Sequence, residues 1–257
     1  MSAARWIAVV FVLLGLQACQ VVPSGQARLG WIPARLEGDI ALDASSGGRN
    51  LSTIRADVED DLGLDESGSI AAGVDLQLPI GRISASYMRY SEEGTGTLTR
   101  SFGDIPAGTS VATDVDIDNV KAFWSFDLLD TGIVRVSPGV GVDYFSIDTT
   151  VRSISALSAF ERIAVDVPMP MVFLEGEVSL GPFSAEAEAG WMSLDLGDVQ
   201  GTLIDIDTRL VWHAVGPLDV FGGYRWIEVD SDGNADGQRY DVDVVLRGFY
   251  FGGGVSF

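Results

Sequence analysis

The sequence is dominated by alternation: from about position 35 to the C-terminus, apolar residues recur at every second position in about ten separate runs. In Ile70–Leu78, for example, Ile70 and Val74 share one face, whereas Asp75 and Gln77 fall on the other. Two is the side-chain period of a β-strand. The sequence therefore predicts an all-β fold of about ten strands, with eight as the alternative count.

Two classes of connection separate these runs. Short turns are expected at 79–81, 128–132, 181–182 and 215–217, whereas the other connections are mostly longer and polar. Tight turns at one end and longer loops at the other are typical of a closed antiparallel transmembrane β-barrel. We expect strands at 36–44, 70–78, 82–91, 112–127, 133–148, 164–180, 183–194, 202–214, 218–229 and 239–257. The segment 149–163 could hold a helical turn, and Pro168 and Pro170 predict a bulge or an extension beyond the membrane.

The apolar face is expected to point outward, toward lipid. No run after the N-terminus approaches the ~20 apolar residues of a membrane helix, whereas strands need only ~9–11 residues each. Large aromatic residues lie near strand ends on the apolar face, as an interfacial belt requires: Trp124, Tyr144, Trp191, Trp212, Tyr224 and Trp226. A soluble barrel would turn this face inward, so the pattern favours the membrane version.

The opposite face carries charge on nearly every strand. The residues that we expect to face the lumen are Asp75, Lys121, Arg135, Asp143, Glu175, Glu177, Glu186, Glu188, Asp205, Asp207, Arg209, Asp219 and Arg225. Burying a charge costs several kcal/mol unless it is paired. We therefore expect an ion-pair network that fills a narrow barrel. The alternative is a narrow, cation-preferring pore whose selectivity comes from the acidic excess.

The last strand ends in FYFGGGVSF, with Phe257 as the final residue. Together with the strand alternation, this ending resembles the small bacterial outer-membrane β-barrels of the broad OmpA- and OmpW-like class. The resemblance implies that Phe257 is a signal for the barrel-assembly machinery. Within this strand, Asp241 and Asp243 are expected to face the lumen, but counting back from Phe257 gives the opposite phase. We therefore expect a bulge near Arg247 and Gly248.

The N-terminus has the pattern of a secretory signal. A single arginine precedes a short apolar stretch within residues 1–18, and Leu16-Gln17-Ala18-Cys19 follows. This sequence resembles the bacterial lipobox, which implies lipidation of Cys19 and sorting to the outer membrane. We expect three segments: a signal peptide over 1–18, a lipidated periplasmic tether over 19–34 and a barrel over 35–257.

Charge and residue counts narrow the chemistry. A net charge of −21 argues against nucleic-acid binding, and a single cysteine excludes an intrachain disulfide. The single histidine, His213, is expected near a periplasmic turn, away from the external rim where barrel hydrolases would need it. We expect no enzyme and no cofactor. A weak calcium candidate is the acidic loop segment with Asp57, Glu59, Asp60, Asp61 and Asp65, whereas Leu62 and Leu64 suggest that this loop folds back on the barrel.

The expected function is a structural or surface-interaction role in the outer membrane, with a largely ion-pair-filled lumen. The alternative is a narrow pore or small-solute transporter, and a remote alternative is an outer-membrane hydrolase. The expected partners are outer-membrane lipids and the barrel-assembly and lipoprotein-sorting machinery. The N-terminus is expected to be lipid-anchored on the periplasmic side.

Overall fold

The computed structural model describes residues 24–42, 55–154, 159–196, 199–235 and 238–257. Ten long antiparallel strands form a closed barrel, which confirms the predicted class and count. They are β1 (Ser24–Leu42), β3 (Glu66–Leu78), β4 (Gly81–Thr97), β5 (Ser110–Ser125), β7 (Val134–Ser153), β8 (Phe160–Leu180), β9 (Phe183–Leu196), β10 (Val199–Val215), β11 (Leu218–Ala235) and β12 (Gln238–Ser256). Two short strands, β2 (Ala56–Asp57) and β6 (Leu129–Asp130), pair with β1 and β7.

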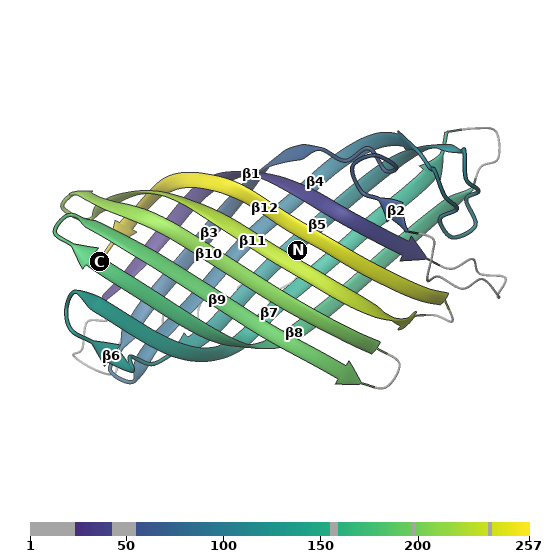
Figure 1. Cartoon of the computed structure of the whole chain (residues 1–257). Helices are drawn as coiled ribbons and strands as arrows, with labels where there is room; N and C mark the ends of the chain where they lie inside the picture. The colour runs from purple at the N-terminus through teal and green to yellow at the C-terminus, as the bar shows by residue number, and fades with distance from the viewer. Residues whose placement is uncertain (1–23, 43–54, 155–158, 197–198, 236–237) are drawn as a thin grey trace, which may run out of the picture.

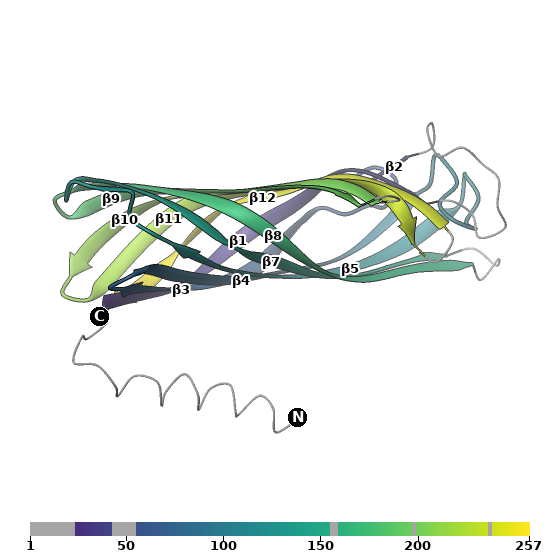
Figure 2. The same ribbon diagram turned by 90° about the horizontal axis from the view of Figure 1, so that it is seen from below.

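Each long strand pairs with the next along the chain, and β12 pairs with β1 to close the barrel (Figure 1). Figure 2 shows the same tilted strands from below, along a long and narrow barrel. The short turns and the C-terminus lie at one end, here called the short-turn end. The opposite end, near β2, is called the long-loop end. Among the described residues, none belongs to a helix that could span a membrane.

The first strand begins earlier than the sequence indicated. Residues 24–34, which we assigned to a tether, belong to β1. Pro33 obscured the alternation, but the proline lies at a place where the β1–β12 pairing is interrupted, between Trp31↔Phe251 and Arg35↔Arg247. Its missing N–H therefore breaks no bond on that side. The signal peptide and Cys19 lie outside the described residues.

The apolar face of several strands changes sides partway along the barrel, as β5 shows. Near the long-loop end, Val115 and Ile117 point inward and are buried, and Asp116 points outward. Toward the short-turn end, Lys121 points inward and Trp124 points outward. The barrel therefore has an upper half, toward the long-loop end, that is built like a soluble protein. Its lower half has an apolar exterior and a charged interior.

This reversal corrects our prediction for the closing strand. The β11–β12 register runs without a break from Leu218↔Val255 to Ala235↔Gln238, so no bulge exists at Arg247 and Gly248. In the upper half Leu246 is buried inside. In the lower half Phe249 and Phe251 are exposed on the outer surface. The two halves of β12 show opposite alternation because the interior of the barrel changes from apolar to charged, not because the strand slips in register.

The lower half carries a continuous apolar outer band. Exposed aromatic residues border it toward the upper half, among them Trp31, Tyr87, Tyr144 and Trp191. Trp124, Trp212 and Phe183 lie near its other edge. An apolar band with aromatic girdles at both edges is what a bilayer requires of a transmembrane barrel.

The prolines of β8 lie at the border between the halves. The β7–β8 register is unbroken through Pro168 and Pro170, so no bulge forms there. The β8–β9 pairing ends at Val172↔Trp191, so both prolines lie beyond it and their missing N–H groups break no ladder bond to β9. The described parts of 149–163 are almost entirely strand, and they contain no helical turn.

An apolar core fills the upper half. Its members include Ile32, Leu36, Met88, Tyr90, Phe145, Leu203, Ile227 and Leu246. The segment after β2 folds back onto this core, because Val58, Leu62 and Leu64 are buried, as Leu62 and Leu64 within the acidic run predicted. Residues 98–109 add buried Leu98, Phe102 and Ile105. Together, 55–65 and 98–109 form a cap at the long-loop end.

Candidate functional site: the charged interior

The lower half gathers the thirteen charged residues of the predicted lumen network. Each of the thirteen lies on the inward face of its strand, and the most buried of them form a layer in the middle of the barrel. Several interior partners were not anticipated. Arg28 lies in the segment that we assigned to a tether, and Arg82 lies at the first position of a predicted strand. Asn119 and Tyr250 are uncharged, so they were not among the predicted charged residues.

Lys121 is the centre of the buried layer. Its Nζ lies 2.8 Å from Asp205 Oδ2 and 2.5 Å from Glu188 Oε1. The Arg225 guanidinium donates to the same Asp205 oxygen at 2.9 Å. Asp205 is fully buried, and the side chains of Lys121 and Arg225 are 3% and 5% exposed. Two cations therefore hold this carboxylate in a place that water does not reach.

The same layer continues to β7 through an amide. Asn119 accepts a hydrogen bond from Arg225 at 2.9 Å and donates one to Asp143 Oδ1 at 2.5 Å. No described residue forms a hydrogen bond with the other oxygen of Asp143, although the residue is fully buried. This layer thus joins β5, β7, β9, β10 and β11 by polar contacts across the barrel.

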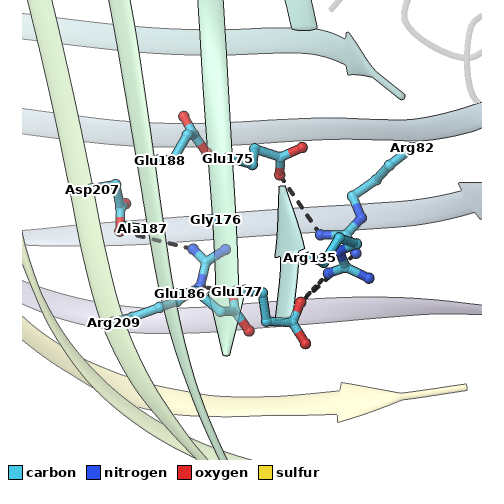
Figure 3. Close-up of a pocket in the computed structure, with 10 residues that line it drawn as sticks. All are labelled: Arg82, Arg135, Glu175, Gly176, Glu177, Glu186, Ala187, Glu188, Asp207 and Arg209. Carbon is cyan, nitrogen blue, oxygen red and sulfur yellow. Dashed lines mark hydrogen bonds and ion pairs between the residues drawn. The ribbon is translucent and has the colours of Figure 1, made fainter. Parts of the chain in front are cut away.

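Four glutamates face one another below this layer, where Glu175 pairs with Glu188 and Glu177 pairs with Glu186 across β8 and β9. Directly opposed like charges destabilise a sheet unless cations intervene. Arginines intervene here: Arg135 binds Glu177, Arg209 binds Glu186 at 2.5 Å, and Arg82 lies 3.7 Å from Glu175 (Figure 3). The cavity among these groups is about 10 Å³, which is space for about one water molecule.

Further polar pairs join interior side chains of other strands. Arg28 on β1 binds Asp75 on β3, and Tyr250 on β12 donates to Asp207 on β10. Arg28 also donates to Gln26 at 2.7 Å. The Tyr250–Asp207 contact connects two strands, β12 and β10, that share no backbone pairing, whereas the Arg28–Asp75 contact reinforces the pairing of β1 with β3.

The short-turn mouth of the barrel is organised around Asp219. One carboxylate oxygen lies 2.7 Å from His213 Nδ1. The other accepts hydrogen bonds from Gln26, at 2.8 Å, and from Ser256. The opposite nitrogen of His213, Nε2, lies 3.4 Å from Ser184 Oγ. The sequence did not reveal this group, because its members come from five strands and are separated by up to 230 positions.

The acidic loop uses its carboxylates to shape the cap. Asp57 accepts hydrogen bonds from the backbone N–H groups of Glu59 and Asp60. Asp61, which is buried, accepts from the backbone N–H and the hydroxyl of Thr99 at 2.9 and 3.0 Å. In the described part of the chain, no group of three or more His, Cys, Asp or Glu side chains is arranged to hold a metal ion. Asp65, the remaining member of the candidate calcium segment, is exposed.

The rim of the long-loop end corrects another expectation. Asp241 and Asp243 do not face the lumen; Arg55 binds both from outside the strands, with 2.9 Å to Asp241. The hydrogen bonds to Asp241 raise the pKa of Arg55 above its ordinary value. The two aspartates point outward because in the upper half the inward positions of β12 belong to the apolar core.

These features define a class: a closed ten-stranded transmembrane β-barrel with a filled interior. The fold is that of bacterial outer-membrane barrels. The chain is similar to the outer membrane protease OmpT from Escherichia coli, with a TM-score of 0.61 and 10% identity over 94% of this chain and 99% of that one. It also resembles the translocator domain of the autotransporter NalP from Neisseria meningitidis, with a TM-score of 0.49 and 13% identity over 98% of this chain and 94% of that one. No protein-family model and no curated sequence matches.

Proposed function

We propose that the protein is an outer-membrane barrel with a structural or surface-interaction role and a lumen closed to solutes. The filled interior carries this proposal. The buried layer around Lys121 and Asp205 spans the barrel, and the apolar core and the cap lie between it and the long-loop end. A solute would have to break ion pairs and then displace closely packed apolar side chains.

Single-channel recording in planar lipid bilayers tests the closed lumen. The purified, folded barrel is expected to give no unitary currents. A cation-preferring current that falls in Glu186→Ala but not in Asp166→Ala would overturn the closed lumen and establish the narrow pore instead. Asp166 is the matched control, because it is an acidic residue on the outer face of β8 and not in the interior.

The outer surface of the upper half supports the surface role. Acidic side chains point outward there on the neighbouring strands β5, β7 and β8 and also on β11: Asp114, Asp116, Asp118, Asp148, Asp166, Glu228 and Asp230. On β5 alone, the stretch from Ser110 to Asp118 projects on the order of 20 Å along the barrel axis, given ~3.3 Å per residue and a strand tilt near 40°. This acidic wall would stand beyond the bilayer and would favour cationic partners.

The orientation that we propose places the short-turn end in the periplasm. Ser24 opens β1 at that end, and only four residues separate it from Cys19. Acyl chains on Cys19 would therefore anchor the chain beside the barrel wall. Mass spectrometry of the mature N-terminus is expected to show a lipidated cysteine at position 19. An unmodified N-terminus would refute the anchor and leave the barrel unaffected.

A further inference from the structure

Three consecutive strands bring a serine, a histidine and an aspartate into a line at the short-turn mouth. Ser184 comes from β9, His213 from β10 and Asp219 from β11. We propose that these residues form a hydrolase triad that cleaves short-chain carboxylic esters. This activity goes beyond the structural role proposed above, and a closed lumen does not conflict with it, because the site lies at the mouth.

The tautomer of His213 follows from its partners. A carboxylate only accepts hydrogen bonds, so the nitrogen 2.7 Å from Asp219 carries the proton. The other nitrogen therefore accepts the hydrogen of the Ser184 hydroxyl, 3.4 Å away. Nucleophile, base and orienting acid are thus connected in the order that acyl transfer requires. Such contacts are commonly long without substrate and shorten when it binds.

Asp219 is held rigidly for this task. Gln26 and Ser256 donate to its second oxygen, and Arg28 fixes Gln26 in turn. The Asp219 side chain is 1% exposed. The pairing of β10 with β11 shifts register between His213 and Val215, and such irregularities re-aim side chains. The orienting carboxylate therefore has little freedom to turn away from the imidazole.

The surroundings limit the size of the acyl group. The His213 side chain is 44% exposed, so the site is reached from the mouth, whereas Ser184 itself is buried. Farther inside, the charged cavity has only about 10 Å³. A fatty acyl chain has no room there, but an acetyl group needs to enter only as far as the serine. The substrate class is therefore an acetyl-sized ester whose alcohol part stays outside the barrel.

The reaction balances with water as the only co-reactant. Ser184 Oγ attacks the ester carbonyl as His213 Nε2 takes its proton. The C–O bond to the alcohol then breaks, the imidazolium protonates the leaving alkoxide, and an acyl-serine remains. Water, deprotonated by His213, hydrolyses this acyl-enzyme, which releases the carboxylic acid and restores the serine.

The test uses the folded barrel in detergent micelles with p-nitrophenyl acetate, p-nitrophenyl decanoate and a fluorophosphonate probe. We expect hydrolysis of the acetate only, and covalent labelling at Ser184. Ser184→Ala and His213→Ala are each expected to lower the rate by at least ~100-fold, the lower range for loss of a proton-transfer partner. Ser184→Ala is also expected to abolish labelling.

Ser179→Ala is the matched control, because Ser179 pairs directly with Ser184 across the sheet but donates to Glu177. It is expected to keep both activity and labelling. Heat-modifiable migration on gels shows for every variant whether the barrel has folded. If the folded wild-type protein is neither labelled nor faster than Ser184→Ala, the triad is only a hydrogen-bonded clasp and the proposal fails. Hydrolysis that Ser179→Ala abolishes equally would overturn it as well.

Discussion

Replacing Lys121 with methionine tests whether the barrel interior is dry. The substitution keeps an unbranched apolar stem but removes the ammonium that lies 2.8 Å from Asp205 and 2.5 Å from Glu188. Arg225 still binds Asp205 in the variant. Among the described residues, Lys121 is the only cation within ion-pair distance of Glu188, whose side chain is only 11% exposed.

The expected cost follows from that burial. Removing one partner of a buried ion pair typically costs about 3–5 kcal/mol, because the remaining charge stays desolvated. An exposed pair contributes only about 0–1 kcal/mol. Arg162 and Asp148 form such a pair on the outer face of the upper half, with side chains 59% and 46% exposed. Lys121→Met and Arg162→Met should therefore differ several-fold in their effect on unfolding.

Urea unfolding of the barrel in lipid vesicles, followed by tryptophan fluorescence, measures the difference. With a slope of about 1–3 kcal/mol per molar urea, Lys121→Met should lower the midpoint by at least about 1 M. Arg162→Met should lower it by a fraction of that. The double variant Lys121→Met/Glu188→Gln should recover part of the loss, because it removes the stranded carboxylate as well as its partner.

Equal midpoints for Lys121→Met and Arg162→Met would refute the reasoning. That result would mean that water reaches Glu188 and Asp205 and screens them as it screens surface charges. The interior would then be hydrated, and the closed lumen would lose its main support. Failure of the double variant to recover any stability would instead show that Glu188 is not the group left stranded.

Two further substitutions test the closure and the cap. Gly252→Ala should slow barrel assembly and destabilise the fold, because the new methyl group would lie 2.2 Å from a carbonyl oxygen of β1. Gly253→Ala is the control, because its methyl group would make only an ordinary contact at 3.5 Å. On heat-modifiability gels, the control variant should fold normally. Asp61→Ala should expose the cap to proteolysis, because the two Thr99 donors that it holds would lose a buried acceptor, at about 1–3 kcal/mol. The exposed neighbour Asp60 serves as the control, and equal cleavage of Asp60→Ala and Asp61→Ala would contradict this role.

The alternation was sufficient to predict the barrel, because strand periodicity and turn residues are local signals. It gave ten strands, the positions of the short turns and the inward face of the lower half. It failed at β1, where Pro33 hides the period, and in the upper half of β12. There, we assigned Asp241 and Asp243 to the lumen as if charged residues faced inward along the whole strand. In the upper half, however, the inward positions are apolar.

The mouth site shows a different limit. Ser184 and His213 are 29 positions apart, and nothing in the sequence relates them. They meet because β9 and β10 pair in a register that places Ser184 opposite Val211, two residues from His213 on the same face. Register depends on where each turn closes, and an error of one residue would move either side chain to the lipid face. Only the strand pairing in the three-dimensional structure shows that Ser184 and His213 lie side by side.

The reversal of the apolar face has a consequence for export. If both faces of a strand were apolar across the whole bilayer, its sequence would become a nearly uninterrupted apolar run. Such runs are retained in the inner membrane as transmembrane helices. Inward charges such as Lys121, Asp205 and Arg225 interrupt such runs on β5, β10 and β11, and their burial cost is offset by pairing once the barrel has closed. In the upper half, where the outer face meets water, outward acids provide the same interruption and apolar side chains fill the interior. On β5, β10 and β11 the interior can therefore change from charged to apolar without the strand becoming apolar on both faces.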